Sequence, residues 1–295
     1  MSILGAIKNT VMEKAILLIQ CKDQKGIVAA VSDFLFYNQG NISEVDQYID
    51  KDSENFFMRV EWELENFKLP KVEIEAAFMN TLGTRFEIQH QLYFTDPKPR
   101  MALFVTKLSH CLFDILGRHQ SGQLGVDIPL IVSNHRELEP IAQGFGIPFY
   151  HFEMNKENKA EQEQKQLNLL KNKNIEFVVL ARYMQILSAD FIAAYPHKII
   201  NIHHSFLPAF VGAKPYHAAH ERGVKIIGAT SHYVTEDLDA GPIIEQDVAR
   251  VRHHNSVEDL VEMGQDVEKV VLSKAIKYHV QRKVMVLGNK TIIFN

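Results

Sequence analysis

Two loops of this chain supply an amide, an imidazole and a carboxylate, a combination that can act on a carbonyl group. Asn201 and His203 end a short apolar run, and alternation along a strand places their side chains on one side. Asp239 lies in a later loop, before Gly241 and Pro242. An amide N–H can stabilise an oxyanion, an imidazole can move a proton, and a carboxylate can orient the imidazole. The three residues therefore predict a site that polarises a carbonyl and transfers protons.

Composition limits the class of protein that carries these residues. The 295 residues are 46% hydrophobic and 23% charged, with a formal net charge of −4. These values predict a globular protein of one or two domains without the basic surface that nucleic acid requires. No apolar run approaches the length of a membrane span, so we expect no membrane association. Only two cysteines, Cys21 and Cys111, occur far apart, which favours a reducing, cytoplasmic compartment.

The elements that must position the site begin with a small N-terminal domain, predicted over residues 12–94. Its pattern is βαββαβ, the order of a ferredoxin-like sandwich. Apolar residues alternate with charged ones from Phe56 to Leu64, which indicates a half-buried antiparallel strand. The fourth strand is expected from Arg85 to Leu92. Residues 95–100 contain two prolines and are predicted as a linker.

The second domain is predicted over residues 101–295. Short apolar runs alternate with helix-length amphipathic segments, a pattern typical of an α/β fold with a mostly parallel, doubly wound sheet. Residues 226–234 and 243–251 are expected to extend this sheet in antiparallel fashion. Sites in such sheets lie at the carboxyl ends of the strands, where Asn201 and His203 are expected.

The N-terminal domain resembles the ACT family at four positions, which are Asp23, Gly26, Asn41 and Ile42. The resemblance implies a regulatory domain that binds a small amino acid where copies pair, with glycine and methionine as the expected effectors and a homo-oligomer as the expected assembly. The alternative is that Gly26 only permits a tight strand-to-helix turn.

The second domain resembles the folate-dependent formyltransferase family in three segments, which are residues 180–187, 201–208 and 238–244. Together with the ACT-like domain, they are similar to the hydrolytic branch of that family over nearly the whole chain. This resemblance implies hydrolysis of 10-formyltetrahydrofolate to formate and tetrahydrofolate, which supplies formate for purine synthesis and balances one-carbon pools. The folate is the substrate, and no permanently bound cofactor is expected.

The chemistry assigns a role to each of the three central residues. We expect Asn201 to donate to the oxyanion, His203 to polarise the carbonyl and act as general acid, and Asp239 to position water and relay a proton. The resemblance implies that six further residues contact the substrate: Tyr183, Met184, Gln185, Leu187, Thr235 and Leu238. Tyr183 and Met184 could equally belong to the core, and Gln185 replaces a basic residue common in the family.

Two other functions remain open from the sequence: formyl transfer to an amine acceptor, and a non-catalytic sensor. The loop from Thr106 to Leu112 favours water as acceptor, because the bulky residues Leu108, His110 and Leu112 occupy the place of the glycines that would cradle a phosphate. His204 should point away from His203 by alternation, and its role is left open. Histidines are frequent around the site, but no H-E-x-x-H pattern occurs, so no metal is expected.

Overall fold

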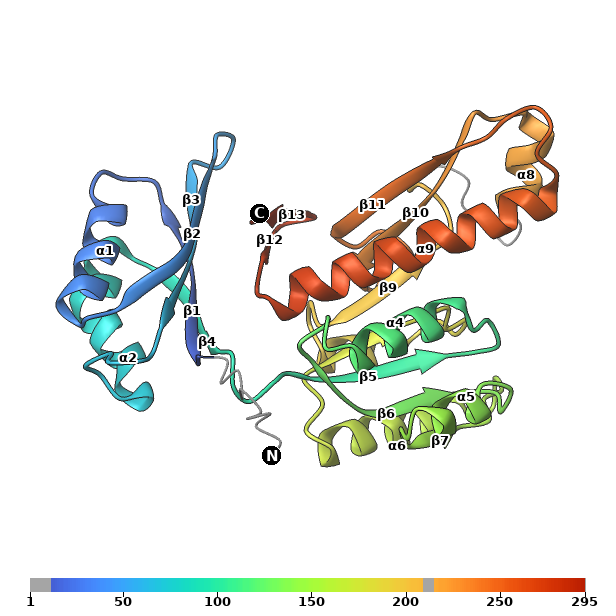
Figure 1. Ribbon diagram of the computed structural model, residues 1–295, viewed down its shortest axis with the longest axis horizontal. Helices are drawn as coiled ribbons and strands as arrows, with labels where there is room; N and C mark the ends of the chain where they lie inside the picture. Colours follow the sequence, from blue (N-terminus) through green and yellow to red (C-terminus); the bar gives the residue numbers. More distant parts are fainter. Residues whose placement is uncertain (1–11, 209–214, 295) are drawn as a thin grey trace, which may run out of the picture. The chain divides into compact units, whose positions relative to one another are not determined.

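A computed structural model describes residues 12–208 and 215–294 (Figure 1). The chain divides into two compact units: the first contains the residues up to Pro97 together with Phe294, and the second is Lys98–Ile293. Among the described residues, no helix is both long and apolar enough to cross a membrane.

The first unit is a four-stranded antiparallel sheet with helices on one face (Figure 1). Its elements are β1 (Lys14–Lys22), α1 (Ile27–Tyr37), β2 (Asn41–Asp50), β3 (Asn55–Glu63), α2 (Lys71–Phe78), a π-turn (Met79–Gly83), α3 (Thr84–Phe86) and β4 (Gln89–Phe94). The strand order is β2-β3-β1-β4. The predicted small sheet domain is confirmed.

The fourth strand begins later than predicted, at Gln89 instead of Arg85. The helical segment continues through the π-turn because apolar residues recur every four positions. Ile74, Phe78, Leu82 and Phe86 are all at most 2% exposed and belong to the core of this unit. The helical period therefore determines the structure of residues 85 and 86.

The second unit is a seven-stranded mixed sheet in the order β11-β10-β9-β8-β5-β6-β7. Its strands are β5 (Arg100–Val105), β6 (Asp127–Ser133), β7 (Phe149–His151), β8 (Phe177–Leu180), β9 (Ile199–His203), β10 (Ile226–Tyr233) and β11 (Ile243–Arg250), and a separate hairpin contains β12 (Val284–Leu287) and β13 (Lys290–Ile293). Strands β5 to β9 are parallel to one another, β10 pairs antiparallel with β9, and β11 pairs antiparallel with β10 at the edge of the sheet. The predicted mostly parallel sheet with an antiparallel extension is confirmed.

Helices cover both faces of this sheet, as a doubly wound fold requires. The helices are α4 (His110–Gln120), α5 (Glu139–Gly144), α6 (Lys159–Asn172), α7 (Ala189–Ala194), α8 (Pro215–Arg222) and α9 (Val257–Val280). Buried side chains of α4, α5 and α9 pack on one face, and those of α6 and α7 pack on the other. From β5 the sheet is built outward through β6 and β7, and the chain then returns to place β8 on the other side of β5. The carboxyl ends of the neighbouring strands β5 and β8 therefore form a switch point, with the end of β9 next to them.

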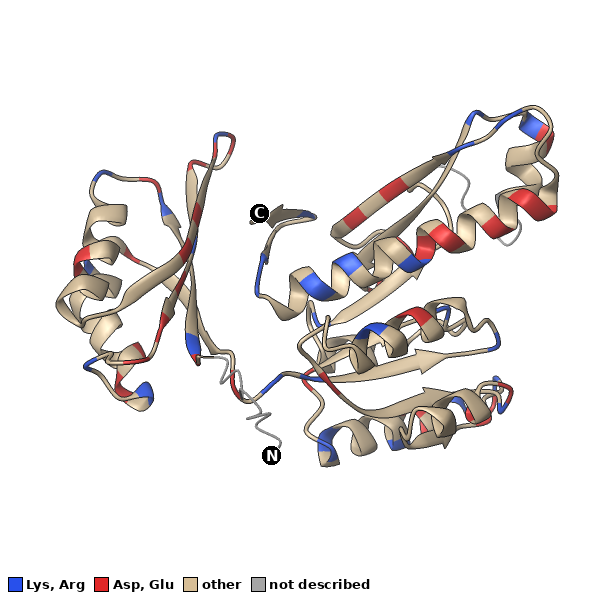
Figure 2. Cartoon of the chain, in the orientation of Figure 1, with Lys and Arg blue, Asp and Glu red and all other residues tan. Residues whose placement is uncertain are grey.

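The long helix α9 has the charge distribution that its dipole favours. Ser256 and Asp259 form a capping box at its start. Acidic side chains occupy its first half and basic ones its later turns (Figure 2). These charges complement the positive amino end and the negative carboxyl end of the helix.

Candidate active site

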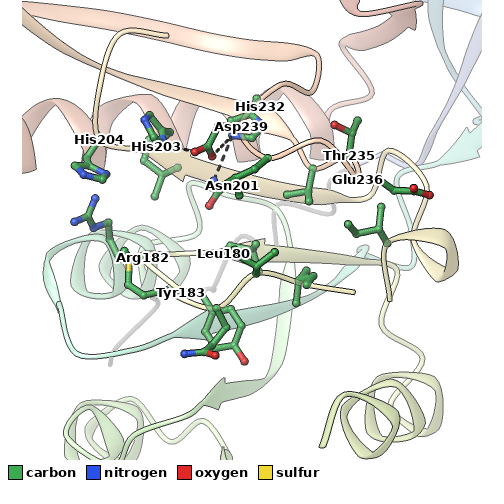
Figure 3. Close-up of a pocket in the computed structure, with 18 residues that line it drawn as sticks. Leu180, Arg182, Tyr183, Asn201, His203, His204, His232, Thr235, Glu236 and Asp239 are labelled. Carbon is green, nitrogen blue, oxygen red and sulfur yellow. Dashed lines mark hydrogen bonds and ion pairs between the residues drawn. The ribbon is translucent and has the colours of Figure 1, made fainter. Parts of the chain in front are cut away.

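A pocket of about 310 Å³ lies at the carboxyl ends of β8 and β9 (Figure 3). Its walls are the loop after β8, the end of β9, and the connection between β10 and β11. All nine residues predicted for catalysis and substrate contact line it: Tyr183, Met184, Gln185, Leu187, Asn201, His203, Thr235, Leu238 and Asp239. The topology therefore brings three distant segments to one cavity.

Asp239 joins the predicted catalytic residues through two histidines. Its Oδ2 accepts from Nδ1 of His203 at 3.1 Å, and its Oδ1 lies 3.5 Å from Nε2 of His232. The amide Nδ2 of Asn201 lies 3.3 Å from the same Nε2 of His232. Figure 3 shows these four side chains grouped on one wall of the pocket. Asn201 and Asp239 are thus linked by His232, which the sequence analysis considered only as one of several histidines.

Hydrogen bonds orient the ring of His232 between Asn201 and Asp239. Its Nδ1–H donates to the carbonyl oxygen of Tyr233 at 3.0 Å. Its Nε2 then faces both the amide of Asn201 and the carboxylate of Asp239. The amide of Asn201 also lines the pocket, where an N–H can donate to an oxyanion.

The imidazole of His203 is held at one nitrogen and unpaired at the other. Nδ1 is bonded to Asp239, and the buried Nε2 has no hydrogen-bond partner among the described residues. The residue is 7% exposed and lines the pocket. A buried unpaired nitrogen is costly unless a ligand completes its bonding, so Nε2 is the atom that should meet the reacting group.

Asp239 is an ionised carboxylate held in an unusual backbone conformation. Hydrogen bonds from His203 and His232 hold its pKa well below the usual range. Its φ is 54°, in the left-handed region. The loop also runs close to β10, because a Cβ added at Gly241 would lie 1.8 Å from the carbonyl oxygen of Tyr233. Gly241 therefore permits the close approach that places Asp239 beside His203.

Two threonines connect the loops that form the site. Thr106, after β5, donates to Oδ1 of Asn134 at 2.9 Å and accepts from the backbone N–H of Met184 at 3.0 Å. Thr230, in β10, donates to the carbonyl oxygen of Ser205 at 2.9 Å and accepts from the N–H of Leu207 at 3.0 Å. These buried bonds hold the β8 and β9 loops at fixed positions relative to the sheet.

The predicted substrate-contacting residues differ in exposure. Tyr183 is 5% exposed, and its hydroxyl contacts the sulfur of Met154 at 3.1 Å, so its ring forms both core and pocket floor. Burial raises the pKa of Tyr183 to about 12, which keeps the hydroxyl neutral. Met184 and Leu238 are 60% and 65% exposed and lie where the pocket opens. Such exposed apolar side chains are suited to packing against a flat ring.

His204 also lines the pocket, contrary to the expected alternation. Its ring centre lies 5.1 Å from that of His203. The reason is that β9 ends at His203, so the strand period no longer applies to the next residue. Burial, with Arg182 and His203 nearby, lowers the pKa of His204 to about 4, and the ring is neutral at pH 7.

A buried carboxylate lies behind His204. Glu268, from α9, is 1% exposed and accepts from His110 at 2.7 Å and from the hydroxyl of Tyr216 at 3.0 Å. Arg182 Nε lies 3.6 Å from the same carboxylate. These contacts hold the pKa of Glu268 below its usual value despite its burial, so we describe it as ionised.

The three bulky residues of the loop after β5 do not all lie at the site. His110 reaches Glu268 as described, but Leu112 is fully buried in the core beneath α4, and Leu108 is 40% exposed. Helix α4 begins at His110, so only its first turn faces the site. The prediction that all three bulky residues occupy one place is wrong for Leu112.

Three side chains of types that bind metal ions lie close together in this region: His110, Cys111 and Glu268. Their ligand atoms are within 4.8 Å of one another. The arrangement does not favour a cation. The guanidinium of Arg182 already faces Glu268, and burial strongly raises the pKa of the Cys111 thiol, which would have to ionise.

The four residues predicted to bind an effector do not meet within one copy of the first unit. Asp23 and Gly26 follow β1, and Asn41 and Ile42 begin β2. In the register, Lys22 at the end of β1 pairs with Asn55, whereas Asn41 pairs with Glu63, at the other end of β3. The two pairs therefore lie at opposite ends of the sheet.

Comparison with known proteins gives consistent matches. The family model "Formyl transferase" matches residues 99–276. Formyltetrahydrofolate deformylases from Synechocystis sp. and Bacillus subtilis are 53% and 47% identical, over 95% and 96% of this chain and 98% and 94% of their own. The crystal structure of a formyltetrahydrofolate deformylase from Pseudomonas syringae pv. tomato has a TM-score of 0.94 at 43% identity, covering 98% of this chain and 96% of that one.

Proposed function

This chain belongs to the formyl transferase family and, within it, to the formyltetrahydrofolate deformylases, and from that premise we propose that its pocket hydrolyses 10-formyltetrahydrofolate to formate and tetrahydrofolate. The observation that carries the proposal is the buried Nε2 of His203, which has no hydrogen-bond partner within residues 12–208 and 215–294, while Asp239 holds the other side of the ring. This nitrogen can meet the formyl group while the folate rings occupy the open, apolar part of the pocket.

The reaction follows from the positions of the three central residues. Water attacks the formyl carbon, and the carbonyl oxygen becomes an oxyanion that Asn201 and a protonated His203 stabilise. Asp239 orients the water and relays its proton. The C–N bond then breaks as the folate nitrogen gains a proton, and formate and tetrahydrofolate leave. We propose that these protein groups suffice without a metal, and metal analysis of active protein tests this.

Hydrolysis and formyl transfer differ in whether an amine is required. The experiment is a formate-release assay with 10-formyltetrahydrofolate alone and with added amines. We expect full release without any amine, because the side chains of His110 and Tyr216 close the region behind His204 by bonding to Glu268. Release that begins only when an amine is added would identify a transferase instead.

We further propose that the first unit binds a small amino acid, with glycine and methionine as candidates, where two copies pair. The separation of Gly26 and Asn41 within one copy supports a site shared between copies. Strand β2 is at the edge of its sheet, and Val45 and Tyr48 are 53% and 46% exposed on it. Apolar residues on an exposed edge favour pairing with another strand.

A charge on this edge tests the pairing. Val45→Glu should shift the protein to a smaller species in sedimentation, whereas Val72→Glu, on a residue 88% exposed in α2, should not. Equal sedimentation of both variants and the wild type would contradict pairing through β2. Calorimetry with glycine and methionine tests the effector.

We place the reaction in the cytoplasm, where the released formate would serve purine synthesis and one-carbon balance. Support for the compartment comes from the cysteines: Cys21 and Cys111 are both free thiols. Growth of a deletion strain with and without added purines and formate tests the metabolic assignment.

A further inference from the structure

Arg182 lies at the inner end of the pocket with a guanidinium group that the protein leaves incompletely bonded. Its side chain is 11% exposed, and its buried Nε has no hydrogen-bond partner in the described part of the chain. A buried guanidinium N–H without an acceptor is costly. An acceptor atom of a bound ligand would complete the bonding of this Nε.

The carboxylate of Glu268 does not meet this need. Its Oε2 lies 3.6 Å from Nε of Arg182, beyond hydrogen-bond range. His110 already donates to Oε2 and Tyr216 to Oε1. Glu268 thus holds the arginine electrostatically and leaves its N–H groups available to a second anion.

The backbone directs Arg182 to this position. Its φ is 62°, in the left-handed region that non-glycine residues rarely adopt. Strain of this kind persists where the surrounding structure demands it and often marks a functional site. Figure 3 shows the guanidinium beneath the ring of His204, on the same side of the pocket as His203.

The hydrogen-bond donors in this part of the pocket suit one small anion. His204 lines the pocket beside Arg182 and is neutral at pH 7, so its ring offers a donor without a second full charge. Arg182 supplies a cation and a planar pair of N–H groups that match a carboxylate.

The pocket also separates the two products in space. Ile186 and Leu238 are 62% and 65% exposed where the cavity opens, and Thr235 and Glu236 lie at the end away from Arg182 (Figure 3). With the folate at the open end and the formyl carbon at His203, the fragment that is cut off lies on the Arg182 side. The fragment is formate, a carboxylate.

We propose that Arg182 and His204 form a subsite that binds the formate product beside His203. The inference rests on the proposed hydrolysis for the identity of the anion. The subsite would receive the carboxylate as the C–N bond breaks and would make formate a product inhibitor.

Binding of formate can be measured without turnover, by saturation-transfer NMR of the formate proton on the full-length protein. We expect saturable binding with a Kd on the order of 1 mM for the wild type. Arg182→Gln should weaken binding about tenfold or more, and Arg182→Lys, which keeps the charge but loses the planar pair of donors, by less. Arg136→Gln is the matched control, since that surface arginine pairs with Glu139 far along the sequence from the pocket loops.

His204→Phe provides an independent variant, because it keeps an aromatic ring and removes the N–H. It should also weaken formate binding. If a thermal melt shows that Arg182→Gln is unfolded, the result for His204→Phe decides whether the subsite binds formate. Wild-type binding in either folded variant, or no saturable binding to the wild type, would overturn the subsite.

The two proposals fail in different ways. If the wild type binds formate through Arg182 but releases none from 10-formyltetrahydrofolate, the proposed hydrolysis is wrong and the anion subsite stands. If it releases formate but Arg182→Gln binds formate like the wild type, only the subsite is wrong.

Discussion

Gly241 offers a test of how the fold positions the catalytic carboxylate. Gly241 is not one of the proposed substrate-contacting residues, but it lies two positions after Asp239. A methyl group at this position would lie 1.8 Å from the carbonyl oxygen of Tyr233, which is part of β10. Because the obstacle is strand backbone, we expect the loop to move instead of the sheet.

The size of the movement follows from the geometry. Ordinary contact begins at 3.4 Å, so the loop must shift by roughly 1.6 Å to accept Gly241→Ala. The bond between His203 Nδ1 and Asp239 Oδ2 is 3.1 Å long, and a shift of this size would break it. A misplacement of about 1 Å can cost about 10²-fold in rate, so we expect kcat/KM to fall by at least about 10². Overpacking should also lower the free energy of unfolding by about 1–3 kcal/mol.

The assay is formate release from 10-formyltetrahydrofolate, with urea unfolding to establish that the variant is folded. Gly144→Ala is the control, because a Cβ there meets nothing within 4 Å at the end of α5. The control should retain wild-type kcat/KM. If folded Gly241→Ala also retained wild-type kcat/KM, the argument that this close approach positions Asp239 would be refuted.

Three further predictions concern single side chains. Asp239→Asn should lower kcat about 10²–10⁴-fold without unfolding the protein, because a neutral amide cannot relay the proton of water and supplies no negative charge beside His203; a wild-type formate-release rate would exclude the proposed role. Burial lowers the pKa of His279 to about 3 from 6.5, so unfolding takes up a proton below pH 6.5, and this group should remove about 2 kcal/mol of stability between pH 7 and pH 5. His279→Phe should remove that part of the pH dependence in urea titrations, and identical pH slopes would contradict it. Tyr216→Phe should lower the free energy of unfolding by about 1.5–3 kcal/mol, since Glu268 loses a buried donor; unchanged urea stability would show that the bond contributes nothing.

The sequence was sufficient to predict the sheet of the second unit. Apolar strand runs alternate with amphipathic helices, and that local pattern leads to a parallel, doubly wound sheet with few alternatives. The error at Arg85 arose because Leu82 and Phe86 continue a four-residue period whose burial is visible only in the packed unit. His204 was misplaced for a similar reason, since the strand ends one residue before it.

Asn201, His203 and Asp239 could be chosen from the sequence because their types and neighbours suit carbonyl chemistry. Their proximity could not be derived from spacing, since it depends on β10 lying antiparallel beside β9 and on the close approach at Gly241. His232 was not predicted as a link between Asn201 and Asp239, because it faces the pair from a neighbouring strand. Arg182 lies within the segment 180–187 that the sequence analysis singled out, but no role in the site was predicted for it.

The sequence by itself thus determined the order of elements and the types of residue available for chemistry, because both depend on local pattern and on side-chain identity. The tertiary structure alone decided which of those residues share a pocket, which carboxylate is buried and paired, and which polar atoms are left without partners. Those properties depend on contacts between segments that are distant in the chain, as when Glu268 of α9 bonds to His110 of α4 and Nε of Arg182 is left without a hydrogen-bond acceptor among the described residues.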